Sequence, residues 1–387
     1  MPSHAILALA RPEVAPLPVY NAGLSSDAVR ARYGVTDIAR LASNENPYGA
    51  SPAVGRALAG LAEQVAWYPD AACTALRSAI AAGSGAQPGE IVVGNGSEDI
   101  LQMLCQAFLS PGDRVLTLLP SFGLHEIYPR MMGATVEMLP VTQALAFDVD
   151  AWCAAVATGP KLVLLPNPSN PVGCMLDAAG FARLVAAVPA GTLLVVDEAY
   201  VEYARLSPGF PDALAVLRAQ ARPWIVLRTF SKAWGLAGLR VGYGIASDAA
   251  LVQMLDRVRT PFNVNAAAQA AALAAWGDAA HMAQAVARTV AERRVLEQQL
   301  HGLGIAGLRW AASATNFLFI DLGRPAGPVA DALLARGIIV KPWKEAGWTH
   351  YLRVTVGLPA DNTRFVQALG ETLRTVPQAA LPLPLPA

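Results

Sequence analysis

The chain of 387 residues lacks the features that mark membrane and nucleic-acid proteins. It has no apolar segment of the ~20 residues that a membrane-spanning helix needs. It also has no run of like charge, and 29 basic residues balance 29 acidic ones, so no strong field attracts nucleic acid or an anionic membrane. Charged residues make up only 15% of the chain and hydrophobic residues 54%. We therefore expect a small-molecule ligand and a large apolar area buried within the chain or between the subunits of a homo-oligomer.

Paired cysteines are absent as well. Four cysteines stand far apart, at Cys73, Cys105, Cys153 and Cys174. This spacing argues against a disulfide framework and against a zinc site, so we expect no metal and buried thiols in a reducing compartment. The apolar stretch at residues 5–10 is too short for an export signal and follows no basic residue. The expected location is the cytoplasm.

The length of the chain predicts more than one domain, because a single core rarely grows past about 250–300 residues. Residues 1–45 contain Pro12, Pro16 and Pro18 and little periodicity, which predicts an extended N-terminal arm that packs on a partner. We assign residues 46–265 to a large domain and residues 266–378 to a small α+β domain. The Ala-Leu-Pro segment at residues 379–387 is of low complexity and is expected to be a flexible tail.

Short apolar runs alternate with helical patterns from about residue 86 onward. The runs lie at residues 91–93, 115–119, 162–165, 193–196, 224–227 and 241–245. Continuous apolar runs between helices are typical of strands buried on both faces of a mostly parallel sheet. Further on, residues 266–276 and 285–300 predict helices, and residues 316–320, 337–340 and 351–356 predict strands. The pattern indicates an α/β fold.

Polar and glycine residues follow four of the predicted strands. They lie at residues 94–97, 167–170, 197–198 and 229–232. In open α/β sheets, ligands bind beyond the carboxyl ends of the strands. We therefore expect these four segments to converge on one site.

The segment Gly94-Asn95-Gly96-Ser97 is a glycine turn that leads into a predicted helix. A helix N-terminus offers free N–H groups and a positive dipole end, which suits a phosphate. Glu98 and Asp99 also suit that dipole as ordinary acids of a first helical turn, so the segment alone leaves both interpretations open. A phosphate site requires both carboxylates to point away from the ligand.

Two further segments carry reactive side chains. Asp197 ends an apolar run, and Tyr200 follows three residues later. A carboxylate there can pair with a protonated pyridine nitrogen, although an isolated Asp at this place is more often a helix cap. Lys232 lies among hydroxyls and glycines with Arg240 eight residues on, a setting that favours an imine-forming lysine and a phosphate held by hydroxyl and guanidinium groups.

Taken in order, these segments and their neighbours resemble the histidinol-phosphate aminotransferases, members of the fold-type I enzymes that depend on pyridoxal phosphate (PLP). The similarity spans nearly the whole chain. It is carried by residues 41–49, 67–70, 94–97, 167–173, 197–200, 231–240, 261–265 and 352–357. The resemblance implies a large, mostly parallel seven-stranded sheet with helices on both faces, a smaller α+β domain, and a homodimer with shared active sites.

The resemblance also implies roles for individual residues. Lys232 becomes the imine lysine and proton shuttle, and Asp197 the partner of the pyridine nitrogen. Asn170 and Tyr200 become donors to the ring oxygen O3′. Phe122 is placed to stack on the ring, where many relatives carry tyrosine.

For the cofactor phosphate, the resemblance implies contacts within one subunit and one contact from the neighbouring subunit. The groups implied in the same subunit are the backbone at Ser97 and Glu98 with the side chains of Thr229, Ser231 and Arg240. Tyr68 is implied to reach the phosphate of the neighbouring subunit.

The implied substrates are histidinol phosphate with 2-oxoglutarate, which give imidazole acetol phosphate and glutamate. Arg353 is implied to clamp a substrate anion in a bidentate fork, although its alternation with apolar neighbours also fits a solvated strand face. Tyr20, Asn46 and Lys341 are the other implied substrate contacts. Lys341 stands where the family carries arginine, so it keeps the charge but loses the fork.

Other functions remain open at this point. Phe122, Trp343 and Trp348 make an aromatic amino acid aminotransferase the main alternative. A phosphothreonine decarboxylase has a related architecture, but Tyr200 and the residues 263–265 fit a transaminase better. A non-catalytic protein of this fold would not need the intact set of Lys232, Asp197, Tyr200 and Arg240.

Overall fold

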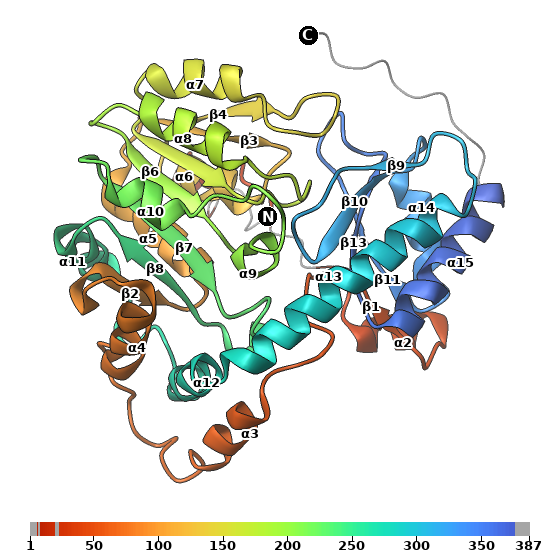
Figure 1. Ribbon diagram of the computed structural model, residues 1–387, viewed down its shortest axis with the longest axis horizontal. Helices are drawn as coiled ribbons and strands as arrows, with labels where there is room; N and C mark the ends of the chain where they lie inside the picture. The colour runs from red at the N-terminus through yellow and green to blue at the C-terminus, as the bar shows by residue number, and fades with distance from the viewer. Residues whose placement is uncertain (1–5, 7, 20–22, 376–387) are drawn as a thin grey trace.

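A computed structural model describes residues 6, 8–19 and 23–375 of the chain. Tyr20 and the expected tail at residues 379–387 lie outside the described residues. Figure 1 shows two sheets side by side, each with its own helices, and the long helix α13 running between them.

The larger sheet has seven strands in the order β2-β8-β7-β6-β5-β3-β4. In chain order they are β2 (Ile91–Gly94), β3 (Arg114–Leu119), β4 (Thr135–Pro140), β5 (Leu162–Pro166), β6 (Leu193–Asp197), β7 (Trp224–Thr229) and β8 (Gly242–Ala246). Strand β8 alone runs opposite to the other six strands. The predicted mostly parallel sheet is confirmed, and its six predicted strands are all present.

Strand β4 is the one strand of this sheet that the sequence does not indicate. It lies at the sheet edge, where its residues alternate between exposed and half-buried. An edge strand of this kind carries no continuous apolar run, which is the pattern used to predict the others.

The inner strands are buried because both faces of the sheet are covered. In β6, Leu194 and Val196 join one apolar core while Leu193 and Val195 join another. Successive side chains of a strand point to opposite faces, so a continuous apolar run supplies both cores. The first core includes helices α4 (Thr74–Ser84), α7 (Val149–Ala157), α8 (Ala178–Ala187) and α12 (Ala266–Trp276), and the second includes α5 (Ser97–Phe108) and α11 (Ala249–Val258).

Short polar side chains start most of these helices. The N-cap carboxylates or amides of Asp148, Asp177, Asp248 and Asn265 accept bonds from backbone N–H groups of the first turn. Such caps satisfy donors that have no partner inside the helix. The remaining helices around this sheet are α3 (Pro52–Ala59), α6 (Leu124–Met131), α9 (Val201–Ala204) and α10 (Ala213–Arg218).

The smaller sheet has four strands in the order β12-β13-β10-β9. These are β9 (Arg309–Trp310), β10 (Phe317–Asp321), β12 (Lys341–Pro342) and β13 (Tyr351–Thr355), with helices α13 (Ala279–His301), α14 (Ala326–Leu334) and α15 (Pro359–Thr375). A third apolar core lies between this sheet and its helices. The strands predicted at residues 316–320 and 351–356 are confirmed.

Two segments cross the boundaries that the sequence suggests for the domains. Within the expected arm, α2 (Ser26–Tyr33) precedes β1 (Ala39–Arg40), which pairs in parallel with β11 (Ile338–Ile339) beside the small sheet. Helix α12 joins the core of the large sheet. Helix α13 contributes Val290 to the core of the large sheet and Leu296 to the core of the small sheet. If the domains are divided by the core in which each residue packs, the boundary between them falls within α13.

The four cysteines are free. Burial raises the pKa of Cys105 and of Cys174 to about 12, which keeps both thiols protonated at neutral pH. None of the helices in the described part of the chain is long and apolar enough to cross a membrane.

Strand β8 and the start of α5 approach each other so closely that Gly242 has no room for a side chain. A Cβ there would lie 2.3 Å from the backbone nitrogen of Ser97 and 2.7 Å from the carbonyl carbon of Gly96. We expect Gly242→Ala to lower the free energy of unfolding by about 1–3 kcal/mol, because backbone atoms must move. Chemical denaturation measures this change.

Gly327→Ala is the matched control for Gly242→Ala. Gly327 lies within α14, and a Cβ there would meet nothing within 4 Å. This variant should be as stable as the unmodified protein, or more stable by about 0.5–1 kcal/mol, because alanine suits a helix better than glycine. Equal stability of the two variants would contradict the close approach at Gly242.

Candidate active site

A cavity of about 500 Å³ lies at the carboxyl edge of the large sheet and opens toward the small one. Residues from the ends of β5, β6 and β7, from the turn before α5 and from β12 and β13 line it. The predicted site residues in its wall are Ser97, Glu98, Phe122, Asn170, Asp197, Tyr200, Thr229, Ser231, Lys232, Arg240, Lys341 and Arg353. The expected convergence of the segments that follow the strands is therefore confirmed.

Lys232 lies in the loop that follows β7, and its side chain enters this cavity. Its Nζ donates to the carbonyl oxygen of Ser43 at 2.9 Å. Burial, with the positive charge of Arg353, lowers the pKa of Lys232 to about 8. A neutral amine is the nucleophilic form of lysine, so the cavity makes this lysine reactive near neutral pH.

Asp197 ends β6, and a buried histidine holds its carboxylate. His125 Nε2 lies 3.1 Å from Oδ2 of Asp197, and His125 Nδ1 lies 3.0 Å from the hydroxyl of Ser121. The other carboxylate oxygen, Oδ1, accepts from the backbone N–H of Ala199 at 3.1 Å. These contacts fix the carboxylate at the cavity wall.

Tyr200 and Asn170 are held by side chains from other parts of the chain: Asn44 bonds Tyr200, and Arg353 of the small sheet bonds Asn170. The side-chain amide of Asn44 donates to the hydroxyl oxygen of Tyr200 at 2.9 Å. Arg353 Nη1 donates to Oδ1 of Asn170 at 2.6 Å, and Arg353 Nη2 donates to the carbonyl oxygen of Ala42 at 2.5 Å. Residues from distant parts of the chain thus orient these two polar side chains in the cavity wall.

The start of α5 and the loop after β7 form a cradle that suits a phosphate. Arg240 Nη1 lies 3.4 Å from the hydroxyl of Ser231, and the backbone N–H of Ser231 donates to Oγ1 of Thr229 at 3.1 Å. A Cβ on Gly96, which has φ of +87°, would lie 2.6 Å from Arg240 Nη2. Only glycine leaves room for the guanidinium beside this helix N-terminus, which is a favourable place for an anion.

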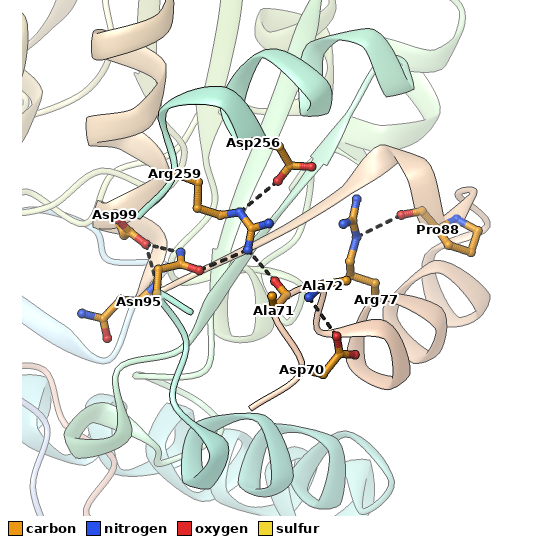
Figure 2. A network of polar contacts seen from close by, with 10 residues as sticks. Asp70, Ala71, Ala72, Arg77, Pro88, Asn95, Asp99, Asp256 and Arg259 are labelled. Atoms are coloured by element: carbon orange, nitrogen blue, oxygen red, sulfur yellow. Dashed lines mark hydrogen bonds and ion pairs between the residues drawn. The ribbon is translucent and has the colours of Figure 1, made fainter. Parts of the chain in front are cut away.

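The two acids that follow Ser97 differ in direction. Asp99 is not part of the cavity wall: its Oδ2 accepts from the backbone N–H of Asn95 at 2.8 Å (Figure 2). The same oxygen accepts from the amide of Asn263 at 2.7 Å. Glu98 lines the cavity, and its Oε1 lies 3.2 Å from Arg240 Nη2. The requirement that both carboxylates point away is met by Asp99 and not by Glu98, because Arg240 attracts the Glu98 carboxylate.

Arg353 and Lys341 place two cations side by side. They are direct partners in the antiparallel register of β12 and β13, so their side chains share one face of the small sheet. Arg353 is 8% exposed. Burial lowers the pKa of Lys341, and the charges of Arg353 and Lys344 lower it further. Like charges opposite each other destabilise a sheet, so this pair suits an anion bound between them.

Three predicted site residues lie elsewhere. Tyr68 is 82% exposed and its ring stacks on that of Phe262, with 4.5 Å between ring centroids, so it does not enter the cavity of its own subunit. Asn46 lies outside the cavity wall, where its amide donates to the carbonyl oxygen of Ala233 at 2.8 Å and holds the Lys232 loop. Tyr20 is outside the described residues.

Sequence reasoning assigned no role to three residues of this site: Asn44, His125 and Glu345. Ser121 precedes α6 and His125 lies in its first turn, so no helical spacing in the sequence indicates the contact between them. Asn44 and Glu345 carry no signal either, since their partners are set by tertiary packing.

The residues present fit pyridoxal phosphate. The cradle that Gly96 leaves open offers a helix N-terminus, two hydroxyls and a guanidinium for the phosphate, Asp197 offers a fixed carboxylate, and Lys232 offers an amine. Among the described residues, no group of three or more His, Cys, Asp or Glu side chains could hold a metal ion.

Comparison with known proteins agrees with this geometry. Residues 36–369 match the family described as aminotransferase class I and II. Histidinol-phosphate aminotransferase 3 of Rhizobium meliloti is 46% identical over 361 residues, which are 93% of this chain and 96% of that protein. Histidinol-phosphate aminotransferase 1 of Mesorhizobium japonicum is 47% identical over 365 residues, which are 94% of this chain and 98% of that protein.

A solved structure is similar over the same length. The crystal structure of histidinol-phosphate aminotransferase from Sinorhizobium meliloti, in complex with pyridoxal-5'-phosphate, has a TM-score of 0.85 and 28% sequence identity, and the match covers 94% of this chain and 97% of that one. The chain therefore belongs to the aminotransferase class I and II family, as a member of the PLP-dependent histidinol-phosphate aminotransferase group.

Proposed function

We propose that the enzyme transfers an amino group from histidinol phosphate to 2-oxoglutarate, forming imidazole acetol phosphate and glutamate. The observation that carries this proposal is the pair of cations Arg353 and Lys341, which share one face of the small sheet in the wall that also contains Lys232. The names of the curated relatives support it.

Both amino compounds present an anion to the same cations. Histidinol phosphate carries a phosphate where glutamate carries its α-carboxylate. A guanidinium binds either group through two parallel N–H bonds, and an ammonium adds a point charge without directional demands. Arg353 therefore serves both half-reactions at one place, and Lys341 adds a second charge that matches a phosphate dianion rather than a carboxylate monoanion.

When bound, the cofactor supplies an electron sink for the bond that breaks at the substrate Cα. Asp197, fixed by His125, would pair with the pyridine nitrogen of the cofactor. Lys232, with its pKa lowered to about 8, would accept the substrate Cα proton on Nζ and would then release it to the cofactor carbon C4′. Asn44 positions the hydroxyl of Tyr200, and the cradle of Ser231 and Arg240 anchors the phosphate at the far end.

The aromatic alternative rests on one observation. Phe122 and Trp343 line the same cavity, so an aromatic side chain would find apolar surface there. Trp348 is not part of the cavity wall, because it packs on Phe319 and Tyr351 in the small sheet.

The first test concerns Lys232. The chain has only four lysines, Lys161, Lys232, Lys341 and Lys344, so borohydride reduction of the PLP-loaded enzyme followed by peptide mapping has four possible outcomes. We expect the label on Lys232. Since its pKa is lowered to about 8, the rate at which the cofactor-free enzyme bonds PLP should rise about tenfold per pH unit below pH 8 and level off above it. A label on Lys341 or Lys344, which share the cavity, would refute the assignment.

The substrate is tested through Lys341. Lys341→Ala removes one cation from beside the substrate phosphate, and a hydrogen bond to a charged group is worth about 1.5–3 kcal/mol. We expect kcat/KM for histidinol phosphate to fall roughly 10- to 150-fold, while phenylalanine, which has no distal charge and whose carboxylate is a monoanion that Arg353 alone can pair, is affected little. Single-turnover half-reactions with each substrate provide the measurement.

Lys161→Ala is the control for this test, because Lys161 is an exposed lysine remote from the cavity. It should leave both substrates unchanged. An equal loss for both substrates in Lys341→Ala would show that Lys341 supports the fold or the carboxylate clamp. A preference of the unmodified enzyme for phenylalanine would favour the aromatic alternative.

We infer that the active unit is a homodimer in the cytoplasm. Tyr68 supports the dimer, because its side chain is exposed in the single chain and stacks on Phe262 outside the cavity of its own subunit. A polar network holds the segment that follows Tyr68: Arg259 donates to the carbonyl oxygen of Ala71 at 2.6 Å (Figure 2). Arg259 also donates to the side-chain oxygen of Asn263, whose amide donates to Asp99 beside the cradle. Four free thiols suit a reducing compartment.

Hybrid dimers test the role of Tyr68. Lys232→Ala and Tyr68→Ala subunits should each be nearly inactive alone. If Tyr68 completes the partner's site, a hybrid has one intact site, so a 1:1 random mixture should recover about one quarter of the unmodified activity. A mixture of Lys232→Ala with Lys232→Arg should recover nothing. Full activity of a monomer in sedimentation would exclude the shared site.

A further inference from the structure

Glu345 differs from the other charged groups of the cavity wall. Arg353 acts on both Lys232 and Lys341, and the acids Glu45 and Glu98 act on Lys232 as well. Glu345 also lines the cavity, in the loop after β12 beside Lys344, yet the charged group that acts on it is another acid, Glu126. The wall thus has a mixed group of cations and acids around Lys232 and, in the loop after β12, a carboxylate whose electrostatic neighbour is an acid.

Glu345 is held in place from both its backbone and its side chain. Trp343 Nε1 donates to its Oε2 at 2.9 Å, and the backbone N–H of Trp348 donates to its carbonyl oxygen at 3.0 Å. The backbone N–H of Trp343 donates to the carbonyl oxygen of Tyr351 at 2.9 Å, which fastens the turn to β13. These three hydrogen bonds hold the turn at residues 343–348, so the carboxylate of Glu345 has a fixed direction.

Aromatic packing makes this turn rigid. The ring of Trp343 packs edge-on against Phe319 with 5.8 Å between centroids, and Phe319 stacks on Tyr351 at 4.6 Å. Trp348 packs on Tyr351 at 5.1 Å. Since these rings belong to the small sheet, the position of Glu345 relative to Arg353 in β13 is set by the sheet itself.

The environment of Glu345 is costly for a carboxylate. Burial raises its pKa, the nearby Glu126 raises it further, and the bond from Trp343 lowers it. Glu126 is itself 2.9 Å from Arg130 on the next turn of its helix, and Lys344 is the charged neighbour along the turn. A half-buried carboxylate that also lines a ligand cavity is best stabilised by a donor that the ligand brings.

We propose that Glu345 accepts a hydrogen bond from the ring N–H of the substrate side chain and so selects an imidazole over a phenyl ring. This deepens the proposed function and rests on it. A substrate with an anion at one end and an imidazole at the other reaches both the cations Arg353 and Lys341 and the carboxylate of Glu345. A phenyl ring fits the apolar wall of Phe122 and Trp343 but adds no donor to the one that Trp343 supplies to this carboxylate, and such a mismatch is strongly discriminating.

Paired inhibitors test this independently of which substrate the enzyme uses. 3-(Imidazol-4-yl)propionate and 3-phenylpropionate share a carboxylate for Arg353 and differ only in the ring. Their inhibition constants are measured against the glutamate half-reaction of the PLP-loaded enzyme. The unmodified enzyme should bind the imidazole compound about 10- to 100-fold more tightly, and Glu345→Gln should abolish that preference by weakening the imidazole compound alone.

The choice of glutamine keeps the loop intact, because its amide oxygen can still accept the Trp343 N–H. Glu126→Gln is the matched control, since it removes the neighbouring acid that lies outside the cavity wall and should change the inhibitor ratio less than about twofold. Glu345→Asp should retain part of the preference.

Two results would overturn the role of Glu345. One is the absence of a preference for imidazole in the unmodified enzyme, including failure of both compounds to bind. The other is an equal weakening of both compounds in Glu345→Gln, which would mean that Glu345 only shapes the loop. A failure of histidinol phosphate as substrate would appear instead in the Lys341→Ala comparison, so the two hypotheses fail separately.

Discussion

The site depends on the hydrogen bonds of one extended segment, residues 41–46, which lies between the two sheets. Its carbonyl oxygens at Ala42 and Ser43 accept from Arg353 and from Lys232. Asn44 donates to Tyr200 and bonds Thr355 of β13 twice, through its backbone N–H and its side-chain oxygen. Every one of these partners lies more than 150 positions away in the chain. The segment therefore sets the distance between the amine of the large sheet and the cations of the small one.

This arrangement explains why so many cations gather in one cavity. Lys232, Arg240, Lys341 and Arg353 all line it, and burial, with the repulsion between these cations, lowers the pKa of both lysines. In the protein alone this cost is partly offset by neutral acceptors such as the carbonyl oxygens of residues 42 and 43 and by Glu98 on Arg240. The two anionic groups of the proposed ligands, the cofactor phosphate and the substrate anion, relieve it much more. Binding of these anions would thus remove repulsion between the cations, and this relief would contribute to the binding free energy of the ligands.

Specificity and catalysis occupy different elements. The reactive lysine and its acid stand at the ends of parallel strands, where the sheet holds them rigidly. Lys341 and Glu345 belong to a short strand and a turn of the small sheet, and the rings that hold this turn lie in the same apolar core as strands of the large sheet. The residues proposed to select the substrate therefore stand on other elements than Lys232, but one apolar core connects the two sets.

The sequence alone determined the class of fold and most of the chemistry. Continuous apolar runs at residues 162–165 and 193–196 can satisfy two cores only as inner strands, and the polar residues that follow them must then meet at one edge. The residues it could not assign depend on contacts between distant segments. His125 is a lone histidine until the fold places it 3.1 Å from Asp197, and Asn46 serves the Lys232 loop rather than the cavity wall. Glu98 faces the cavity because Arg240 attracts it, and Glu345 does so because Trp343 and β13 fix its turn. Local patterns specify which elements form, whereas side-chain directions follow from packing between elements, and only the tertiary structure decides that.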